Sequence, residues 1–233
     1  MQIAFIFARG GSKDVLRKNV RVVAGKPLIA HSIETALSCS LVDKVVVSTD
    51  SEEITEVSRE FGAEILLRPD ELALDHSSEV DAWRHAIDFY SEVFSGGDSP
   101  FFLSLPATSP LRVVEDIENA IRRFREVSCD ILFGISPSQR SPYLNMVKVS
   151  EDGLLEVLIK EVDAVRRQDV PEVYDVTTAV YVAGAEYIKG CASLMSGKVG
   201  YSLVPPERAL DIDTEFDLHV ADLLLSNPFD LKL

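Results

Sequence analysis

Short apolar runs alternate with amphipathic segments along the first two-thirds of the chain. The apolar runs predict buried β-strands at residues 3–7, 44–48, 64–67, 101–105 and 131–135. Between them, apolar residues recur at helical spacing, as at Ile29, Ile33 and Ala36 or at Ile117, Ala120, Ile121 and Phe124. Strands that alternate with helices are typical of βαβ units joined by right-handed crossovers. The sequence therefore predicts an α/β fold with a mostly parallel sheet.

The pattern changes after residue 135. Pro137 and Pro142 interrupt it, and the apolar runs 146–149 and 154–159 then flank Glu151-Asp152-Gly153, which predicts a β-hairpin. The hairpin is either a decoration on the sheet edge or an arm that reaches a partner, and the pattern leaves both open. Without a Gly- or Ser-rich linker, we expect one domain, 1–233, with an inserted segment at 137–172.

Regular structure is expected to resume near residue 180. Strands are predicted at 180–183 and 201–204. A final helix follows, and the spacing of its apolar residues predicts that its inner face consists of Phe216, Val220, Leu223 and Leu224.

The composition indicates a globular protein and disfavours several functional classes. Hydrophobic residues form 46% of the 233 residues and charged ones 26%, which is typical of a globular protein. A net charge of −15 disfavours general nucleic-acid binding. The opening apolar run ends at Arg9, too short for a signal peptide or a membrane span, so we expect a cytoplasmic protein without a membrane partner. Three scattered cysteines and four unpaired histidines disfavour a disulfide framework and a zinc site.

A basic, glycine-containing loop follows the first predicted strand. Paired glycines let backbone amides approach a ligand closely, and several cations in an otherwise acidic protein indicate an anion site. The residues concerned are Arg9, Gly10, Gly11, Lys13, Arg17 and Lys18. The loop is neither a GxGxxG fingerprint nor a P-loop, which disfavours a Rossmann oxidoreductase. A solvated turn is the alternative.

Two carboxylates stand two residues apart near the C-terminus, at Asp211 and Asp213. On an extended segment such side chains point to one face, where they suit Mg²⁺, which takes one or two carboxylates together with waters and phosphate oxygens. The alternative is that Asp213 or Thr214 is the N-cap of the last helix and Asp211 a surface charge.

Other polar groups follow predicted strands. Thr108 and Ser109 come after the strand at 101–105, and ligands of open α/β sheets bind beyond the carboxyl ends of strands. The hydroxyl groups also suit helix capping, and Ser77 or Ser78 could cap the helix that contains Trp83. Arg166 and Arg167 suit two-point binding of a carboxylate or phosphate, or ordinary surface pairing.

Five segments together carry a resemblance to a known family. They are 8–13 with Lys18-Asn19, 47–50, 108–112, 167–169 and 211–214. In order and spacing they resemble the acylneuraminate cytidylyltransferases, over nearly the whole chain. The resemblance implies a Rossmann-like fold with a β-hairpin dimerisation arm, and therefore a homodimer. It also implies an enzyme that joins CMP from CTP to a nine-carbon acidic sugar such as a sialic, legionaminic or pseudaminic acid and releases pyrophosphate.

The resemblance also assigns residues. Arg9 and Lys18 would be the catalytic cations, and Asp211 and Asp213 would hold Mg²⁺. The nucleotide-binding residues would be Arg9, Gly10, Gly11, Ser12, Lys13, Lys18, Asn19, Ser77 and Ser78. The sugar-binding residues would be Thr108, Ser109, Arg166 and Gln168. Transfer to phosphorus asks the protein mainly for positioning and charge neutralisation, so no side-chain nucleophile is needed.

Three segments depart from the family pattern. Asp14-Val15-Leu16 replaces Gly-Ile-Pro in the nucleotide loop, while Pro106-Ala107 and Thr177-Thr178 replace Gln-Pro and Asn-Gly near the expected sugar pocket. We expect Asp14 to point away from the ligand and to pair with Arg17 or Lys18. The departures keep two alternatives open: a related nucleotidyltransferase with another base or a shorter ulosonic acid, and a nucleotide-binding protein without turnover.

Overall fold

A seven-stranded sheet forms the centre of the computed structural model, which describes residues 1–12, 14–74, 77–96, 101–160 and 166–227. The strand order is β11-β7-β10-β6-β1-β4-β5. The strands are β1 (Ile3–Phe7), β4 (Lys44–Thr49), β5 (Glu64–Leu67), β6 (Phe102–Ser104), β7 (Ile131–Pro137), β10 (Tyr174–Ala183) and β11 (Val199–Leu203). Only β10 runs antiparallel to its neighbours in this described sheet. The predicted α/β fold with a mostly parallel sheet is confirmed.

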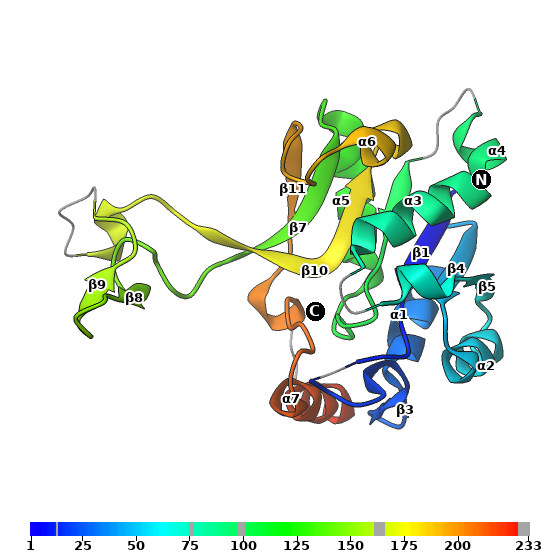
Figure 1. The fold of residues 1–233 in the computed structure, drawn as a ribbon, viewed down its shortest axis with the longest axis horizontal. Coiled ribbons are helices and arrows are strands. Elements are labelled where there is room, and N and C mark those ends of the chain that lie inside the picture. The colour runs from blue at the N-terminus through cyan, green and yellow to red at the C-terminus, as the bar shows by residue number, and fades with distance from the viewer. Residues whose placement is uncertain (13, 75–76, 97–100, 161–165, 228–233) are drawn as a thin grey trace.

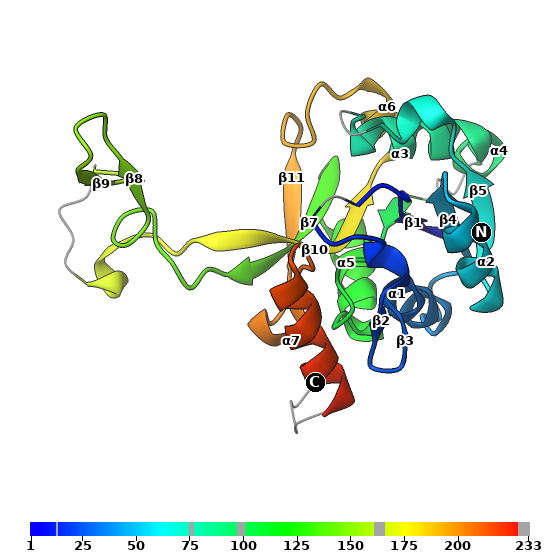
Figure 2. The same ribbon diagram turned by 60° about the horizontal axis from the view of Figure 1, so that its bottom comes forward.

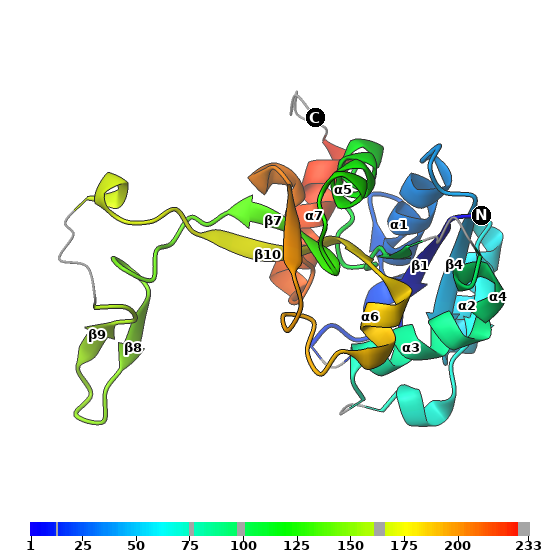
Figure 3. The same ribbon diagram turned by 90° about the horizontal axis from the view of Figure 1, so that it is seen from above.

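Helices cover both faces of the sheet, as Figure 3 shows. On one face, α1 (Leu28–Leu37), α2 (Glu52–Glu60) and α5 (Val114–Glu126) pack through side chains such as Ile33, Ile54 and Ile117. On the other, α3 (Glu79–Phe89), α4 (Ser91–Phe94) and α6 (Ala185–Gly190) pack around the fully buried Trp83. The 3₁₀ turns are η1 (Lys18–Val20), η2 (Asp70–Leu72), η3 (Arg167–Asp169) and η4 (Pro206–Arg208).

The strand order fixes where a ligand can bind. From β1 the chain proceeds to β4 and β5 on one side, whereas β6 lies on the other side. The crevice of an open α/β sheet opens where the order reverses, beyond the carboxyl ends of the strands. The loops after β1, β4, β5 and β6 therefore meet at one edge of the sheet.

An arm extends from the body of the molecule, on the left in Figures 1 and 2. β7 and β10 lead into it, and it carries the antiparallel pair β8 (Val147–Val149) and β9 (Leu155–Val157). The predicted hairpin is confirmed. The strand expected at 180–183 begins earlier, at Tyr174, because residues 174–176 pair with the outer end of β7.

The last helix, α7 (Glu215–Ser226), packs on a small cluster below the sheet edge. Leu218 and Ala221 are buried there against Val23 and Leu28, beside the short pair β2 (Val22–Val23) and β3 (Lys26–Pro27). The predicted inner face is wrong in part, since Phe216 is 74% exposed and Leu223 50%. The register of the buried stripe, 218, 221 and 225, points these two side chains outward.

No helix within the described ranges is both long and apolar enough to span a membrane.

Candidate functional site

A cavity of about 370 Å³ lies at the expected edge of the sheet. It brings together the loops after β1, β5 and β6 with the segment that precedes α7. Its lining includes Arg9, Arg68, Ser78, Thr108, Asp211 and Asp213. We call it the nucleotide cavity below, after the predicted nucleotide-binding residues in its lining. Residues from opposite ends of the chain thus meet where the strand order predicts a ligand site.

The loop after β1 is held by its own polar contacts. Asn19 is buried and its Nδ2 donates to the Arg9 carbonyl oxygen at 3.2 Å. The Gly10 amide donates to Asp50 Oδ1 at 3.1 Å, and a Cβ at Gly10 would lie 3.1 Å from Ser51 Cβ. A side chain at residue 10 would therefore crowd Ser51. Arg9 reaches the cavity and donates through Nη1 to the Leu74 carbonyl at 3.3 Å.

The other residues assigned to this loop are not seen to line the cavity. Gly11 has open space around its Cα, and the Ser12 amide donates to the Gly10 carbonyl at 3.2 Å. Neither lines the nucleotide cavity. Lys13 lies outside the described residues.

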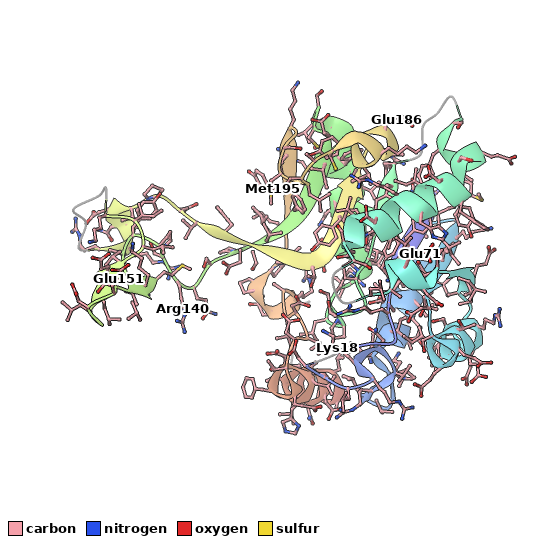
Figure 4. The ribbon with its side chains drawn as sticks, in the orientation of Figure 1. Lys18, Glu71, Arg140, Glu151, Glu186 and Met195 are labelled. Atoms are coloured by element: carbon pink, nitrogen blue, oxygen red, sulfur yellow. The ribbon has the colours of Figure 1, made fainter. Side chains whose placement is uncertain are left out.

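Lys18 stands beside the paired carboxylates, near the start of α7 in Figure 4. Its Nζ is 3.5 Å from Asp213 Oδ1 and also donates to the Ile212 carbonyl. The backbone near both partners is held in place, because Val15 and Ile212 are both buried in the hydrophobic cluster that packs against α7. The structure therefore brings the predicted basic loop and the predicted Asp pair together.

Asp211 is half-buried, with its Oδ1 lacking a hydrogen-bond partner among the described residues. Burial raises the pKa of its carboxyl group, and the nearby hydroxyls of Thr108 and Thr178 act against that rise. Thr214, not Asp213, caps α7: its Oγ1 accepts from the Asp217 amide at 3.2 Å. The capping alternative thus holds for Thr214, and Asp211 is not a surface charge.

The carboxylate pair suits a divalent cation that brings further ligands with it. Asp213 is 71% exposed, and the unpartnered Asp211 oxygen offers a second ligand. No group of three or more His, Cys, Asp or Glu side chains within the described ranges could form a complete cage. Mg²⁺ keeps several waters and binds through one or two carboxylates plus substrate phosphates, so these residues fit it.

The serine and threonine hydroxyls divide between capping and the site. Ser78 caps α3 by accepting from the Val80 amide at 3.2 Å, and Ser77 Oγ donates to the Glu71 carbonyl at 2.8 Å, yet both line the nucleotide cavity. Thr108 and Ser109 do not cap the next helix, because the Asp116 carboxylate accepts from the Val113 amide there. Thr108 lines the cavity, while Ser109 is buried behind it.

A second cavity, of about 460 Å³, adjoins the first. Thr178 and Asp211 line both, and the second extends to Ser138 and Arg140 on the arm. Figure 4 shows Arg140 on the segment that leads away from β7. Pro106 and Ala107, expected near the sugar pocket, line the nucleotide cavity, whereas Thr177 lines the second cavity.

Arg166 and Arg167, farther along the arm, line neither of these two cavities. Arg166 forms a two-point ion pair with Asp169, at 2.9 and 3.0 Å. Arg167 donates to the Ser138 and Gln139 carbonyls. Together with Gln168, Arg167 lines a different hollow on the arm. Within one chain, Arg166 and Gln168 are therefore not brought to Asp211.

Sequence reasoning missed the inner wall of the nucleotide cavity. Arg68 directly follows β5, is buried, and donates to the Ser48 carbonyl at 2.9 Å. Burial lowers its pKa, while the charges of Asp50 and Glu79 act against that. Glu79 accepts from Trp83 Nε1 at 3.3 Å, and burial raises the pKa of its carboxyl group. The position of Arg68 after a predicted strand was the available signal.

The expected pairing of Asp14 is wrong. Arg17 pairs with Glu53, and Lys18 pairs with Asp213. Glu53 lies in the first turn of α2, close to the loop after β1, and draws Arg17 away from the site. Asp14 itself is exposed, which agrees with its expected orientation away from the cavity.

Comparison with known proteins identifies the family. A flagellin modification protein B from Campylobacter coli is 32% identical over 94% of this chain and 93% of its own length. A CMP-N,N'-diacetyllegionaminic acid synthase from Campylobacter jejuni is also 32% identical, over 95% and 93%. An N-acylneuraminate cytidylyltransferase from Streptococcus agalactiae is 30% identical over 94% of this chain and 52% of its own.

A solved structure shares the fold. That of CMP:2-keto-3-deoxy-manno-octonic acid synthetase complexed with CTP superposes with a TM-score of 0.74, at 16% identity, over 98% of this chain and 100% of the other. The family model for cytidylyltransferases matches residues 3–179, which is more than half of the chain. The chain therefore belongs to the cytidylyltransferase family.

Proposed function

We propose that this cytidylyltransferase transfers CMP from CTP to a sialic-acid-like nonulosonic acid, in the cytoplasm, and releases pyrophosphate. One observation carries the proposal: the nucleotide cavity, with Arg9 and Arg68 in its lining, and the second cavity meet at Thr178 and Asp211. Two substrates that react with each other must lie in adjoining spaces with their reacting atoms at the junction. The relatives named for legionaminic and neuraminic acids support the choice of acceptor.

The nucleotide cavity offers cations of the kind that a triphosphate needs. Arg9 lines it, and Lys18 lies beside its Asp213 wall. The buried Arg68 and the neighbouring Glu79 add a donor and an acceptor for the polar edge of a base. We assign the triphosphate to the Arg9 and Lys18 side and the base to the Arg68 side.

In the proposed reaction a hydroxyl oxygen of the sugar attacks the α-phosphorus of CTP. A new O–P bond forms, the bond to the pyrophosphate oxygen breaks, and the hydroxyl proton is lost to solvent or buffer. Arg9 and Lys18 neutralise the charge that develops on the phosphoryl and leaving groups. Asp211 and Asp213 would hold Mg²⁺, which supplies charge neutralisation and a template for the phosphates when bound.

The arm supports a homodimer. β8 and β9 form an isolated two-stranded sheet, which is marginal in water on its own. Several large apolar side chains on it are nevertheless exposed: Val147, Val149, Leu154, Leu155 and Leu158. We propose that a second copy covers them, that the second cavity holds the sugar, and that Arg166 and Gln168 then serve the second cavity of the partner.

The test is pyrophosphate release from CTP and Mg²⁺ with sialic, legionaminic, pseudaminic and Kdo-type acids in turn. We expect release with at least one nine-carbon acid and little with ATP, GTP or UTP. Removal of residues 143–160 should yield a monomer in sedimentation at micromolar concentration and should lower activity. Failure with every acid would refute the enzymatic proposal, and a full-length monomer would refute the arm's role.

A further inference from the structure

Thr178 lies where the two cavities meet, with a hydroxyl group that the proposed reaction does not yet use. Thr178 and Asp211 are the two described residues that line both cavities. Thr178 Oγ1 is 2.7 Å from Ser109 Oγ, on the loop after β6. A half-buried hydroxyl therefore stands between a buried serine and the half-buried carboxylate.

The backbone on both sides of Thr178 is held in place. The pairing of β10 with β7 is interrupted between Val176 and Tyr181, so the chain bulges over Gly134. A Cβ at Gly134 would lie 2.9 Å from Thr177 Oγ1, which shows how closely the bulge is packed. On the other side, the buried Arg112 donates to the Ala179 carbonyl at 2.6 Å. Such a bulge redirects a side chain.

The hydrogen-bonding capacity of hydroxyl groups indicates which partner donates in the contact between Ser109 and Thr178. A hydroxyl donates once and accepts up to twice, whereas an ionised carboxylate only accepts. If Thr178 donates toward Asp211, then Ser109 is the donor in the 2.7 Å contact. Ser109 is 1% exposed, so water does not compete for this bond. Asp211 Oδ1 itself is buried and has no hydrogen-bond partner among the described residues.

We propose that Thr178 is a positioning residue for Asp211: held by Ser109, its hydroxyl fixes the orientation of the Asp211 carboxylate at the junction of the two cavities. Thr178 acts through Asp211 and does not bind the metal itself. The inference rests on the proposed function in that it takes Asp211 as a Mg²⁺ ligand.

The experiment measures CTP binding by calorimetry without any sugar, once in Mg²⁺ and once in EDTA. The ratio of the two Kd values gives the gain in affinity due to the metal. Thr178→Val removes the hydroxyl and keeps the shape, Thr178→Ser keeps the hydroxyl, and Asp211→Asn is the reference for a lost ligand. Thr35→Val is a matched control, because its hydroxyl bonds only within α1, to the His31 carbonyl.

We expect Thr178→Val to reduce the metal-dependent gain about tenfold while the Kd in EDTA stays within twofold of the wild type. Thr178→Ser and Thr35→Val should retain the gain. Ser109→Ala should reduce it more mildly, and the double variant Ser109→Ala/Thr178→Val should match Thr178→Val alone, because Ser109 acts through Thr178.

Two outcomes overturn the inference, and they are distinguishable. If Asp211→Asn loses the gain but Thr178→Val keeps it, Asp211 is the ligand and Thr178 does not position it. If Asp211→Asn keeps the gain, the metal assignment within the proposed function fails and the role of Thr178 fails with it. If the losses of metal-dependent gain from Ser109→Ala and Thr178→Val add up in the double variant, Ser109 does not act through Thr178, and the inference is likewise refuted.

Discussion

The buried ion pair between Asp116 and Arg208 offers a sharp test of how the site is held in place. Arg208 ends η4, three residues before Asp211, and Asp116 lies in the first turn of α5. The two side chains are 7% and 0% exposed, and Arg208 Nη2 is 2.8 Å from Asp116 Oδ1. Two further bonds run from Arg208 Nε to the same carboxylate. The pair therefore fastens the segment that carries Asp211 to the body of the protein.

Arg208→Met should strongly destabilise the protein, because it leaves the Asp116 carboxylate buried and uncompensated. Breaking such a pair costs about 3–5 kcal/mol, a large share of a total stability of roughly 5–15 kcal/mol. For a chain of this size, each 1 kcal/mol lowers Tm by about 2–4 °C, so we expect a fall of ~6–20 °C. Urea denaturation and calorimetry measure both quantities.

A double variant separates the buried charge from loss of packing. In Asp116→Asn/Arg208→Met the amide oxygen can still accept from the Val113 amide and keep the helix cap, but no charge remains buried. Most of the lost stability should return. Arg122→Met on the same helix breaks only an exposed pair with Glu118 and should cost under about 1 kcal/mol. A small effect of Arg208→Met, or no recovery in the double variant, would refute this account of the pair.

Three further predictions follow from single residues. Burial raises the pKa of Asp211, so the protonated group contributes its full stability below pH 3.8, and this contribution is lost as the pH rises through the raised pKa. Asp211→Asn should therefore unfold at a higher Tm than the wild type at pH 7 and at an equal Tm near pH 3. Its turnover should fall at least tenfold. Gly134→Ala should cost about 1–3 kcal/mol in urea denaturation through the contact with Thr177 Oγ1, and an unchanged midpoint would contradict it. Asp14→Asn should leave turnover within about threefold, because the side chain is exposed, and a hundredfold loss would make it a ligand.

Features that depend on neighbouring residues were predictable from the sequence. The apolar runs marked the strands of the sheet except the outer part of β10, where Tyr174, Asp175 and Val176 are exposed on the arm and lack a buried pattern. The basic loop and the Asp pair were each visible because their charges cluster locally. The contact between the loop and the Asp pair was not predictable, since the approach of Lys18 to Asp213 depends on how the cluster under α7 packs.

Features that depend on the partner of a side chain were not predictable. Arg166 and Arg167 are alike in sequence, yet each is engaged by a different group on the arm. Arg112 belongs to a motif expected near the ligand, but it is buried among the Pro106 and Ala179 carbonyls and Ser32 Oγ, and burial lowers its pKa to about 10. No pattern of hydrophobicity distinguishes an arginine that binds a ligand from one that joins two loops.

The electrostatics of the site explain why a metal and a triphosphate should bind together. Without ligands, Lys18 is the cation beside Asp213, and Asp211 keeps an oxygen without a described partner. A metal alone would meet two carboxylates and a competing ammonium group, while a triphosphate alone would meet the charges of both aspartates. Under the proposed function, Asp211 and Asp213 would hold the metal, their charges would be neutralised, and Lys18 would be free to face the phosphates. The acidic pair and the basic loop would therefore favour the metal–nucleotide complex over either component, and Asp211 lies at the junction where the second cavity begins.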